Sequence, residues 1–283
     1  MLYHAVSEGE SFDVVNAADR VFADYSDRIF VKPKVLHKFG RTTSANNGVK
    51  TTVATFQSTI VNETFSTGNS IDALASGSSL DVGIVSVEGH YFDADLNLVF
   101  SVQDVQMTGK TSAPLNPTLA RATRLFPPKQ TIASPAVSLT GPVYVYDTVA
   151  SGGLSSGVPV NAAASKLVVG AGKNQSEKCA TALSGIDYWL VTSCYAALNR
   201  AVGSGVNADV EIEFRQLGGV WLPLGVEMQL RTAADHQSFH AFDPCLIVPK
   251  NSDVRMVAIS DTDNSVVSGY IRGHLALVRN IPA

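Results

Sequence analysis

The clearest pattern in the chain is a strict alternation of apolar and polar residues in its second half. From Asp209 to Gln216 apolar residues take every second position, and charged side chains fill most of the others. Residues 220–230 alternate in the same way, and Gly218-Gly219 lies between the two runs. A period of two is typical of a strand with one solvated face, and paired glycines allow the positive φ of a tight turn. The two runs therefore predict a long β-hairpin.

Further strands are expected on both sides of this hairpin. The predicted strands are 188–197, 246–248, 254–259 and 266–278, with turns at 249–253 and 261–264. Clusters of Pro, Gly, Asn, Asp and Ser mark such turns because each lowers the cost of a turn conformation. The segment 188–197 has a buried helix as its alternative, since Ala196, Ala197 and Leu198 suit a helix.

The first half of the chain alternates less regularly but still favours strands. Its expected elements are a strand at 29–39, a hairpin turn at Asn46-Asn47-Gly48 leading into 50–57, and a hairpin of 80–88 and 96–103 around 92–95. Two further segments resemble linkers. Residues 111–135 contain five prolines, which oppose regular ladder pairing, and residues 151–157 are rich in Gly and Ser.

These patterns together predict an all-β protein of two β-sandwich or jelly-roll-like units with an N-terminal arm. Turn signals recur roughly every 8 to 15 residues, no convincing amphipathic helix interrupts them, and long connections favour a jelly roll. The expected boundaries are 1–40 for the arm, 41–145 for an N-terminal sandwich and 146–283 for a C-terminal jelly-roll-like sandwich.

Composition narrows the possible functions. The chain is 45% apolar and 16% charged, with a net charge of −4 and a pI of about 5.8. No basic field is therefore available for a phosphate backbone, and nucleic-acid binding is not expected. The sequence lacks an apolar run of about 18 residues and an N-terminal secretory signal, so no membrane association is expected. The three cysteines are expected to be reduced and buried, in a protein folded in a cytoplasm.

Two motifs resemble ligand sites but depart from them. Residues 170–176 resemble a phosphate-binding loop, yet Leu167 replaces its first glycine and Asn174 its hydroxyl residue, so we expect a β-turn. His236 and His240 have the spacing of a metal pair on a helix. In the extended segment expected there they would lie about 13 Å apart, which is too far for one ion.

Carboxylates also form two suggestive groups. Asp209, Glu211 and Glu213 could serve a glycosidase, but they share one face of a predicted strand, so we expect a solvated surface. Asp93 and Asp95 alternate as in a calcium loop, but the glycine and the distal glutamate of that loop are missing. A turn at the tip of a hairpin is expected there.

Aromatic residues give one candidate binding platform. Trp189, Trp221, Tyr188 and Tyr270 could stack on a sugar, although aromatic residues on strands more often form core or cross-strand pairs. No G-x-S-x-G elbow or reactive cysteine context occurs. We therefore expect no enzyme activity and assign no catalytic, cofactor-binding or metal-binding residue.

Several segments resemble the virion proteins of podovirus-type phages. They are residues 172–176, 187–198, 209–216, 246–260 and 268–277, together with VEGHYFDADLNLVF at 87–100 and PLNPTLARATRLF at 114–126. The resemblance covers most of the chain after about residue 80. It implies a capsid cement or decoration protein, a β-sandwich that binds the major capsid protein on the shell exterior, commonly as a trimer. A tail component and a receptor- or glycan-binding protein are the alternatives.

The N-terminal segment is the candidate partner-binding region. Residues 8–26 fit either one helix or an extended arm. Phe12, Val15, Val21, Phe22 and Tyr25 give the segment apolar side chains that could order on a neighbouring subunit. The low charge of the chain suits large buried contacts, and many copies on one shell would multiply weak ones.

Overall fold

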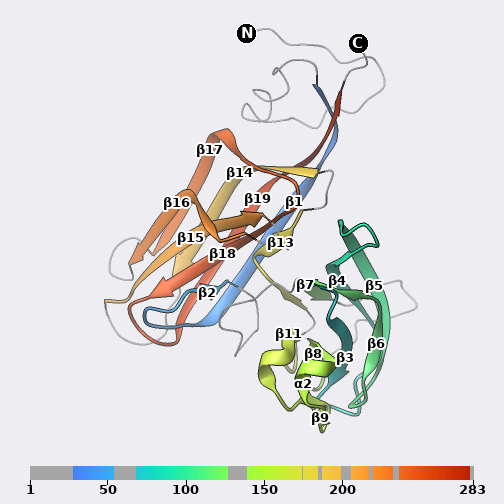
Figure 1. Cartoon of the computed structure of the whole chain (residues 1–283). Helices are drawn as coiled ribbons and strands as arrows, with labels where there is room; N and C mark the ends of the chain where they lie inside the picture. The colour runs from blue at the N-terminus through green and yellow to red at the C-terminus, as the bar shows by residue number, and fades with distance from the viewer. Residues whose placement is uncertain are drawn as a thin grey trace, which may run out of the picture.

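The computed structural model describes residues 28–53, 68–126, 139–173, 175–183, 187–198, 205–216, 219–231 and 236–280. Nearly all of the regular structure in these residues is β-strand, so the expected all-β class is confirmed. The strands build two sandwiches that lie side by side (Figure 1). We call them the large sandwich and the small sandwich.

The large sandwich consists of two antiparallel sheets around one core. Its sheets have the orders β1-β19-β14-β17 and β13-β18-β15-β16, and β2 also pairs with β18. The bounds are β1 (Arg28–Ala45), β2 (Thr51–Thr52), β13 (Ala180–Ala182), β14 (Asp187–Leu198), β15 (Asn207–Gln216), β16 (Leu222–Arg231), β17 (Gln237–Val248), β18 (Ser252–Ser260) and β19 (Ser265–Asn280). Trp189, Ile212, Met256 and Ile271 lie in the core between the sheets. The β15–β16 hairpin and strand β14 confirm the expectations for those segments.

The strand order of the large sandwich is that of a jelly roll. Because β2 and β13 both pair with β18, they count as one interrupted strand, which gives eight strands in chain order. One sheet then holds the first, eighth, third and sixth strands. The other sheet holds the second, seventh, fourth and fifth strands. This interleaving of two Greek keys confirms the jelly-roll-like unit expected from the sequence.

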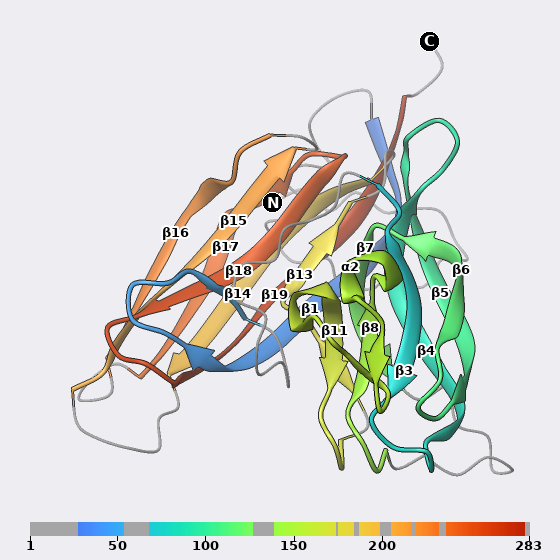
Figure 2. The same ribbon diagram turned by 60° about the horizontal axis from the view of Figure 1, so that its bottom comes forward.

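The small sandwich is built from the residues between β2 and β13. Its sheets have the orders β11-β8-β3-β6 and β12-β7-β4-β5 (Figure 2). The bounds are β3 (Ile71–Ser76), β4 (Val82–Phe92), β5 (Leu98–Thr108), β6 (Ala113–Leu119), β7 (Arg121–Phe126), β8 (Val143–Tyr146), α2 (Thr148–Ser151), β9 (Leu154–Ser155), β10 (Val158–Pro159), β11 (Ser165–Val169) and β12 (Ser176–Glu177). A separate apolar cluster that includes Leu74, Val87, Leu125 and Val145 fills it.

The small sandwich is therefore an insertion in one strand of the jelly roll, and the expected domain boundaries need correction. The boundary expected between residues 145 and 146 falls inside β8. Strand β8 pairs with β3 and β11, so the small sandwich continues past residue 146. The chain returns to the large sandwich at Lys178–Cys179, between β12 and β13. Residues 28–40 of the expected arm belong to β1, which pairs with β19 along its length.

Two local expectations are also wrong. The proline-rich segment expected to lack ladder pairing contains β6 and β7. Pro114 and Pro117 are tolerated because β6 is an edge strand, where a missing N–H breaks no ladder.

The turn after Asn46 is confirmed by the hydrogen bond from Val49 N to Asn46 O (3.2 Å). It does not form the expected hairpin, because β2 pairs with β18 in the opposite sheet.

The cores are packed tightly enough to require glycine at the crossing of backbone segments. A Cβ at Gly273 of β19 would lie 2.1 Å from Leu190 O and 2.7 Å from Trp189 Nε1. In the small sandwich, a Cβ at Gly89 would lie 2.0 Å from Arg121 O. These distances are far inside van der Waals contact, so any larger residue would displace backbone.

Candidate interaction surface

Four aromatic side chains, one from each strand of the β1-β19-β14-β17 sheet, lie in one row across that sheet. Phe39 pairs with Tyr270, which also pairs with Tyr195. Tyr195 in turn pairs with Phe239 on the edge strand β17. The rings of Tyr195 and Tyr270 stack with centroids 5.6 Å apart and planes 21° apart. We call these four side chains the aromatic row.

The aromatic row faces away from the core. Cys194 and Ile271 directly adjoin Tyr195 and Tyr270 in sequence, and both are buried in the core of the large sandwich. Since successive side chains of a strand point to opposite faces, the two tyrosines lie on the outer face. Phe239, which is 58% exposed, carries the row to the sheet edge. The row thus presents aromatic surface that the core does not use.

Basic and apolar side chains flank the aromatic row on the same face. The neighbouring rows across the sheet are Val35–His274–Leu190–Ile247, His37–Arg272–Ser193–Ala241 and Arg41–Ser268–Ala197–Gln237. The paired positions of the four rows contain two arginines and two histidines, and the exposed Asp243 lies on β17 between Ala241 and Ile247. Val35 and Ile247 are 49% and 44% exposed. This surface, which we call the outer face, is aromatic at its centre and carries positive charge.

His37 links the basic and aromatic parts of the outer face. Its ring meets the edge of Tyr270 with centroids 5.0 Å apart and also contacts Phe39 at 6.1 Å. Partial burial, and then the charge of Arg272, lowers the pKa of His37 below its usual value. Arg41 and Arg272 are the permanent positive charges of the face.

A second group of exposed apolar side chains lies on the small sandwich. Val82 and Ile84 of β4 and Phe100 and Val102 of β5 are each between 45% and 60% exposed. Phe100 also meets the ring of His90 edge-on at 5.4 Å. We call these four residues the β4–β5 patch. It contains one aromatic ring, compared with four in the aromatic row.

Buried ion pairs join the two sandwiches. Arg121 of β7 donates to both carboxylate oxygens of Asp253 of β18, at 2.9 and 3.1 Å. Arg215 of β15 donates to the same carboxylate at 3.1 Å. Arg121 and Asp253 are 2% and 0% exposed. Such a bidentate, fully buried pair fixes geometry, because removing Asp253 would take the carboxylate from both arginines, whereas removing Arg121 would leave Asp253 with Arg215.

A second cluster of charges adjoins this ion pair at the junction. Lys38 of β1 binds Glu88 of β4, and its Nζ lies 3.9 Å from Glu177 of β12. Arg124 lies 3.4 Å from the other oxygen of Glu177. Burial raises the pKa of Glu177 to about 7 despite these two cations. Burial, and then the charges of Lys38 and Arg121, lowers the pKa of His90 to about 3.

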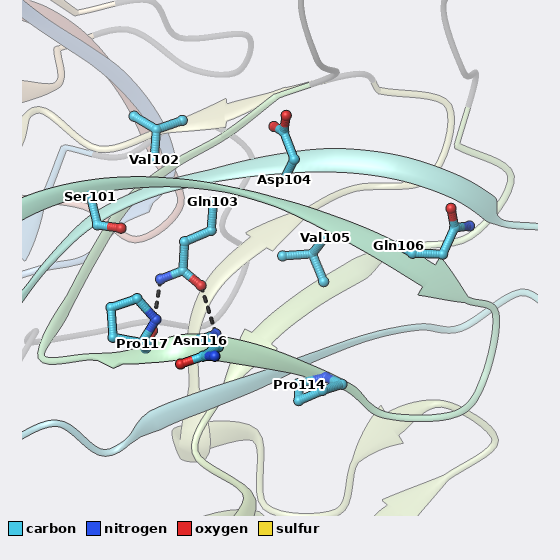
Figure 3. Close-up of a pocket in the computed structure, with 9 residues that line it drawn as sticks. All are labelled: Ser101, Val102, Gln103, Asp104, Val105, Gln106, Pro114, Asn116 and Pro117. Atoms are coloured by element: carbon cyan, nitrogen blue, oxygen red, sulfur yellow. Dashed lines mark hydrogen bonds between the residues drawn. The ribbon is translucent and has the colours of Figure 1, made fainter.

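An open groove of about 520 Å³ separates β5 from β6 in the small sandwich (Figure 3). The Gln103 side chain spans it, donating to Pro117 O at 2.7 Å and accepting from Asn116 N at 2.8 Å. Among the nine lining residues Asp104 is the titratable one, and its carboxylate accepts a hydrogen bond from Ser86 Oγ at 2.5 Å. The groove thus lies between the edges of the two sheets of the small sandwich, and the Gln103 amide links these edges across it.

The carboxylate group of β15 differs from the expected solvated face. Glu213 is 3% exposed and accepts hydrogen bonds from Arg255 Nε at 2.9 Å and Lys50 Nζ at 2.6 Å. Lys50 also donates to Glu211 at 2.9 Å. The expectation is wrong for Glu213 because β15 lies between β16 and β18, whose side chains cover it. The group is a set of ion pairs within one sheet.

The four residues of the expected aromatic platform do not come together, and Tyr188 pairs with Ala276, six residues along β19 from Tyr270. Trp189 is fully buried, and Trp221 lies under the guanidinium groups of Arg255 and Arg215, 4.0 and 4.8 Å from its ring centroid. Tyr270 belongs to the aromatic row instead. Its partners Phe39, Tyr195 and Phe239 were not selected from the sequence. Each directly follows a residue that is buried or half-buried in the structure. The alternation of inward and outward positions along these strands was the signal that could have identified them.

The two loop motifs form turns, as expected. Lys173 N donates to Gly170 O at 3.1 Å, which closes a turn before Asn174. Asp93 Oδ1 accepts from the backbone N–H groups of Asp95 at 2.9 Å and Asn97 at 2.8 Å. The Asp93 carboxylate therefore caps the tip of the β4–β5 hairpin.

The remaining sequence candidates are placed as follows. His240 lies in the extended strand β17 with its ring against Phe242 at 5.6 Å. The three cysteines are free and buried, as expected. No group of three or more potential metal ligands occurs among the described residues. Within the same residues, no helix has the length and apolar character needed to cross a membrane. The candidate partner-binding residues lie outside the described residues; they are Phe12, Val15, Val21, Phe22 and Tyr25.

Comparisons with known proteins do not identify a family for this chain. No protein-family model matches the chain, and no curated protein matches it. Among solved structures, a chain from the structure of infectious bursal disease virus Gt strain is similar at 11% identity, with a TM-score of 0.20. The match covers 91% of this chain and 75% of that one. A similarity this low carries no argument about fold or function.

Proposed function

We propose that the chain is a non-enzymatic structural subunit of a virus particle, a cement protein that binds the major capsid protein on the outside of the shell. The observation that carries the proposal is the outer face of the β1-β19-β14-β17 sheet. It presents an aromatic row with flanking arginines and exposed Val35 and Ile247. Aromatic residues and arginine are the side chains that dominate binding energy at protein interfaces.

The jelly-roll order of the large sandwich supports this proposal by analogy. Double-sheet jelly rolls occur in viral capsid proteins and in lectins, and both groups act by binding rather than by a reaction at the fold itself. A fold alone does not determine function, so the argument depends on the surface that this jelly roll presents. The resemblance of residues 87–100 and 187–198 to phage virion proteins points the same way.

The proposed partners follow from the same features. The chain binds the major capsid protein and other copies of itself, and a trimer is the proposed oligomer. A net charge of −4 favours neither nucleic acid nor an anionic membrane as a partner. The proposed location is the capsid exterior, after synthesis in the cytoplasm of a bacterial host. Three free buried cysteines agree with folding in a reducing compartment.

Binding to empty shells tests the proposal. Purified protein is mixed with shells assembled from the major capsid protein of the same virus, and the shells are recovered by sedimentation. The wild type is expected to sediment with the shells at a fixed ratio. The Phe239→Ser variant is expected to bind at least roughly tenfold more weakly, because hot-spot aromatic residues contribute about 2 kcal/mol or more. Val160→Ser, at an exposed site on the small sandwich, is the matched control.

A glycan-binding protein is the second candidate, and the aromatic row also favours it. Tyr195 and Phe239 lie beside the polar side chain of Gln237, and the Tyr195 hydroxyl donates to the Gln237 amide oxygen at 3.1 Å. Aromatic rings with adjacent amides are a common way to hold a sugar. Binding of the wild type, but not of Tyr195→Ser, to immobilised glycans would favour this candidate over the cement role.

A further inference from the structure

Residues 1–27 hold most of the negative charge of the chain. They contain six carboxylates, at Glu8, Glu10, Asp13, Asp19, Asp24 and Asp27, and one arginine, so their side chains carry a net charge of −5. Since the whole chain carries −4, the other 256 residues together carry +1. The segment also contains four aromatic residues: Tyr3, Phe12, Phe22 and Tyr25. Residues 1–27 are thus acidic and contain aromatic side chains, whereas the rest of the chain has almost no net charge.

The outer face has the complementary character. Arg41 and Arg272 lie on either side of the aromatic row, and the exposed Asp243 lies farther along β17, beyond Ala241. An acidic segment with aromatic side chains would pair its charge with the two arginines and its rings with the row. Complementary charge of this kind sets partner and orientation, and aromatic contacts supply affinity.

The path of β1 carries the segment away from its own outer face. Strand β14 begins with Asp187 opposite Leu277, whereas β1 and β19 continue to pair up to Arg28 and Asn280. The last three pairs form a two-stranded ribbon, about 10 Å long, that projects beyond the other described strands (Figure 1). The N-terminal segment is therefore attached to β1 at the tip of this projecting ribbon. The segment therefore starts beyond the end of its own outer face.

The length of the segment is sufficient for this contact. Twenty-seven residues reach up to about 90 Å when extended. A sheet of four strands is about 14 Å wide between its outer strands. The segment can therefore cross the whole outer face of a neighbour and still leave residues for the connection.

We propose that residues 1–27 of one copy bind the outer face of a second copy, so that the arms link successive subunits. This inference deepens the proposed function, on which it rests for its biological setting. Exchange of arms between identical chains is a low-cost route to assembly, because one segment and one face serve every contact. Because the shell contact proposed above uses the same face, one face holds either the arm of a second copy or the major capsid protein, and the linked and shell-bound forms are alternative states of the protein.

Complementation between two full-length variants tests the proposal without particles. The arm variant carries Phe12→Ser, Phe22→Ser and Tyr25→Ser. The face variant carries Phe239→Ser and Arg272→Glu. The wild type is expected to self-associate, and each variant alone is expected to be monomeric. An equimolar mixture is expected to form one heterodimer of twice the 29.9 kDa chain mass, because the intact arm of one variant fits the intact face of the other.

The outcomes separate this inference from the proposed function. A mixture that stays monomeric, or an arm variant that associates like the wild type, would overturn the inference in analytical ultracentrifugation. A monomeric wild type would overturn it as well, since an arm bound to its own face links nothing. Circular dichroism at matched temperature identifies any variant that fails to fold, and the synthetic peptide 1–27 with a scrambled control then tests the face on wild-type protein in competition. Failure of shell binding, measured separately, would leave arm exchange standing.

Discussion

Arg121 of the small sandwich and Asp253 of the jelly roll form a buried, bidentate ion pair although 132 residues separate them. This contact joins an inserted unit to the strand that its insertion interrupts, since β18 pairs with both halves of that strand. The apolar cores of the two sandwiches are separate clusters. Charge pairs at the junction are therefore expected to determine how firmly the two units are held together.

Breaking the ion pair should separate the unfolding of the two sandwiches. Asp253→Asn is expected to cost about 3–5 kcal/mol, because the buried Arg121 charge loses this carboxylate, and Arg121→Leu is expected to cost less, because Arg215 still donates to Asp253. The double variant Arg121→Leu/Asp253→Asn should cost less than the sum of the two single changes. Calorimetry should then show two transitions for each single variant. Equal, additive losses would show that the two side chains act independently.

Glu177 should make the protein less stable as the pH rises. Its pKa is about 7 in the folded protein and 4.5 for the free side chain, so the folded state binds the extra proton. Its contribution is therefore fully present below pH 4.5 and is lost as the pH rises to about 7, on the order of 1 kcal/mol per unit. Glu177→Gln should remove this loss in urea unfolding measured at several pH values. Glu227→Gln, at an exposed position, is the control.

His90 should have the opposite dependence on the acid side. Its pKa falls from 6.5 to about 3 on folding, so the unfolded state binds the extra proton. Its contribution is present above pH 6.5 and is lost as the pH falls towards 3, again on the order of 1 kcal/mol per unit. His90→Gln should flatten the acid limb of the stability curve. Between pH 4.5 and 6.5 the slopes from His90 and Glu177 oppose each other, so the assignment of His90 is contradicted if His90→Gln leaves the acid limb as steep as in the wild type.

The close approach at Gly273 gives a prediction about packing. Gly273→Ala should destabilise the large sandwich by about 1–3 kcal/mol or more, since its Cβ would lie 2.1 Å from Leu190 O. Gly68→Ala is the matched control, because nothing lies within 4 Å of a Cβ at that position. Thermal unfolding of the two variants should therefore differ by several degrees. Equal melting temperatures would mean that the β14–β19 crossing relaxes at little cost.

The sequence predicted the strands better than it predicted their arrangement. The hairpin of β15 and β16 was visible because both strands have one buried face, so their residues alternate. The insertion was not visible, since β2 and β13 are short and are united by pairing with β18 far along the chain. The strands β6 and β7 were missed because Pro114 and Pro117 oppose pairing in general but not at a sheet edge.

The candidate surface could be predicted only in part for a related reason. Tyr270 was selected from the sequence, but its row partners come from strands that meet through long-range register. A shift of one residue in any strand would send its ring into the core instead. The burial of Glu213 likewise depends on Lys50 and Arg255, which lie far from it in the chain. The partner-binding role of residues 1–27 remains a prediction.

Copy number in purified virus particles tests the central claim most directly. Quantitative mass spectrometry would compare this chain with the major capsid protein in particles of the virus that encodes it. A cement protein should be present at a ratio near one, or at a regular fraction that fills every equivalent position of the shell. A handful of copies per particle, or none, would contradict the account and leave a jelly-roll protein that acts elsewhere.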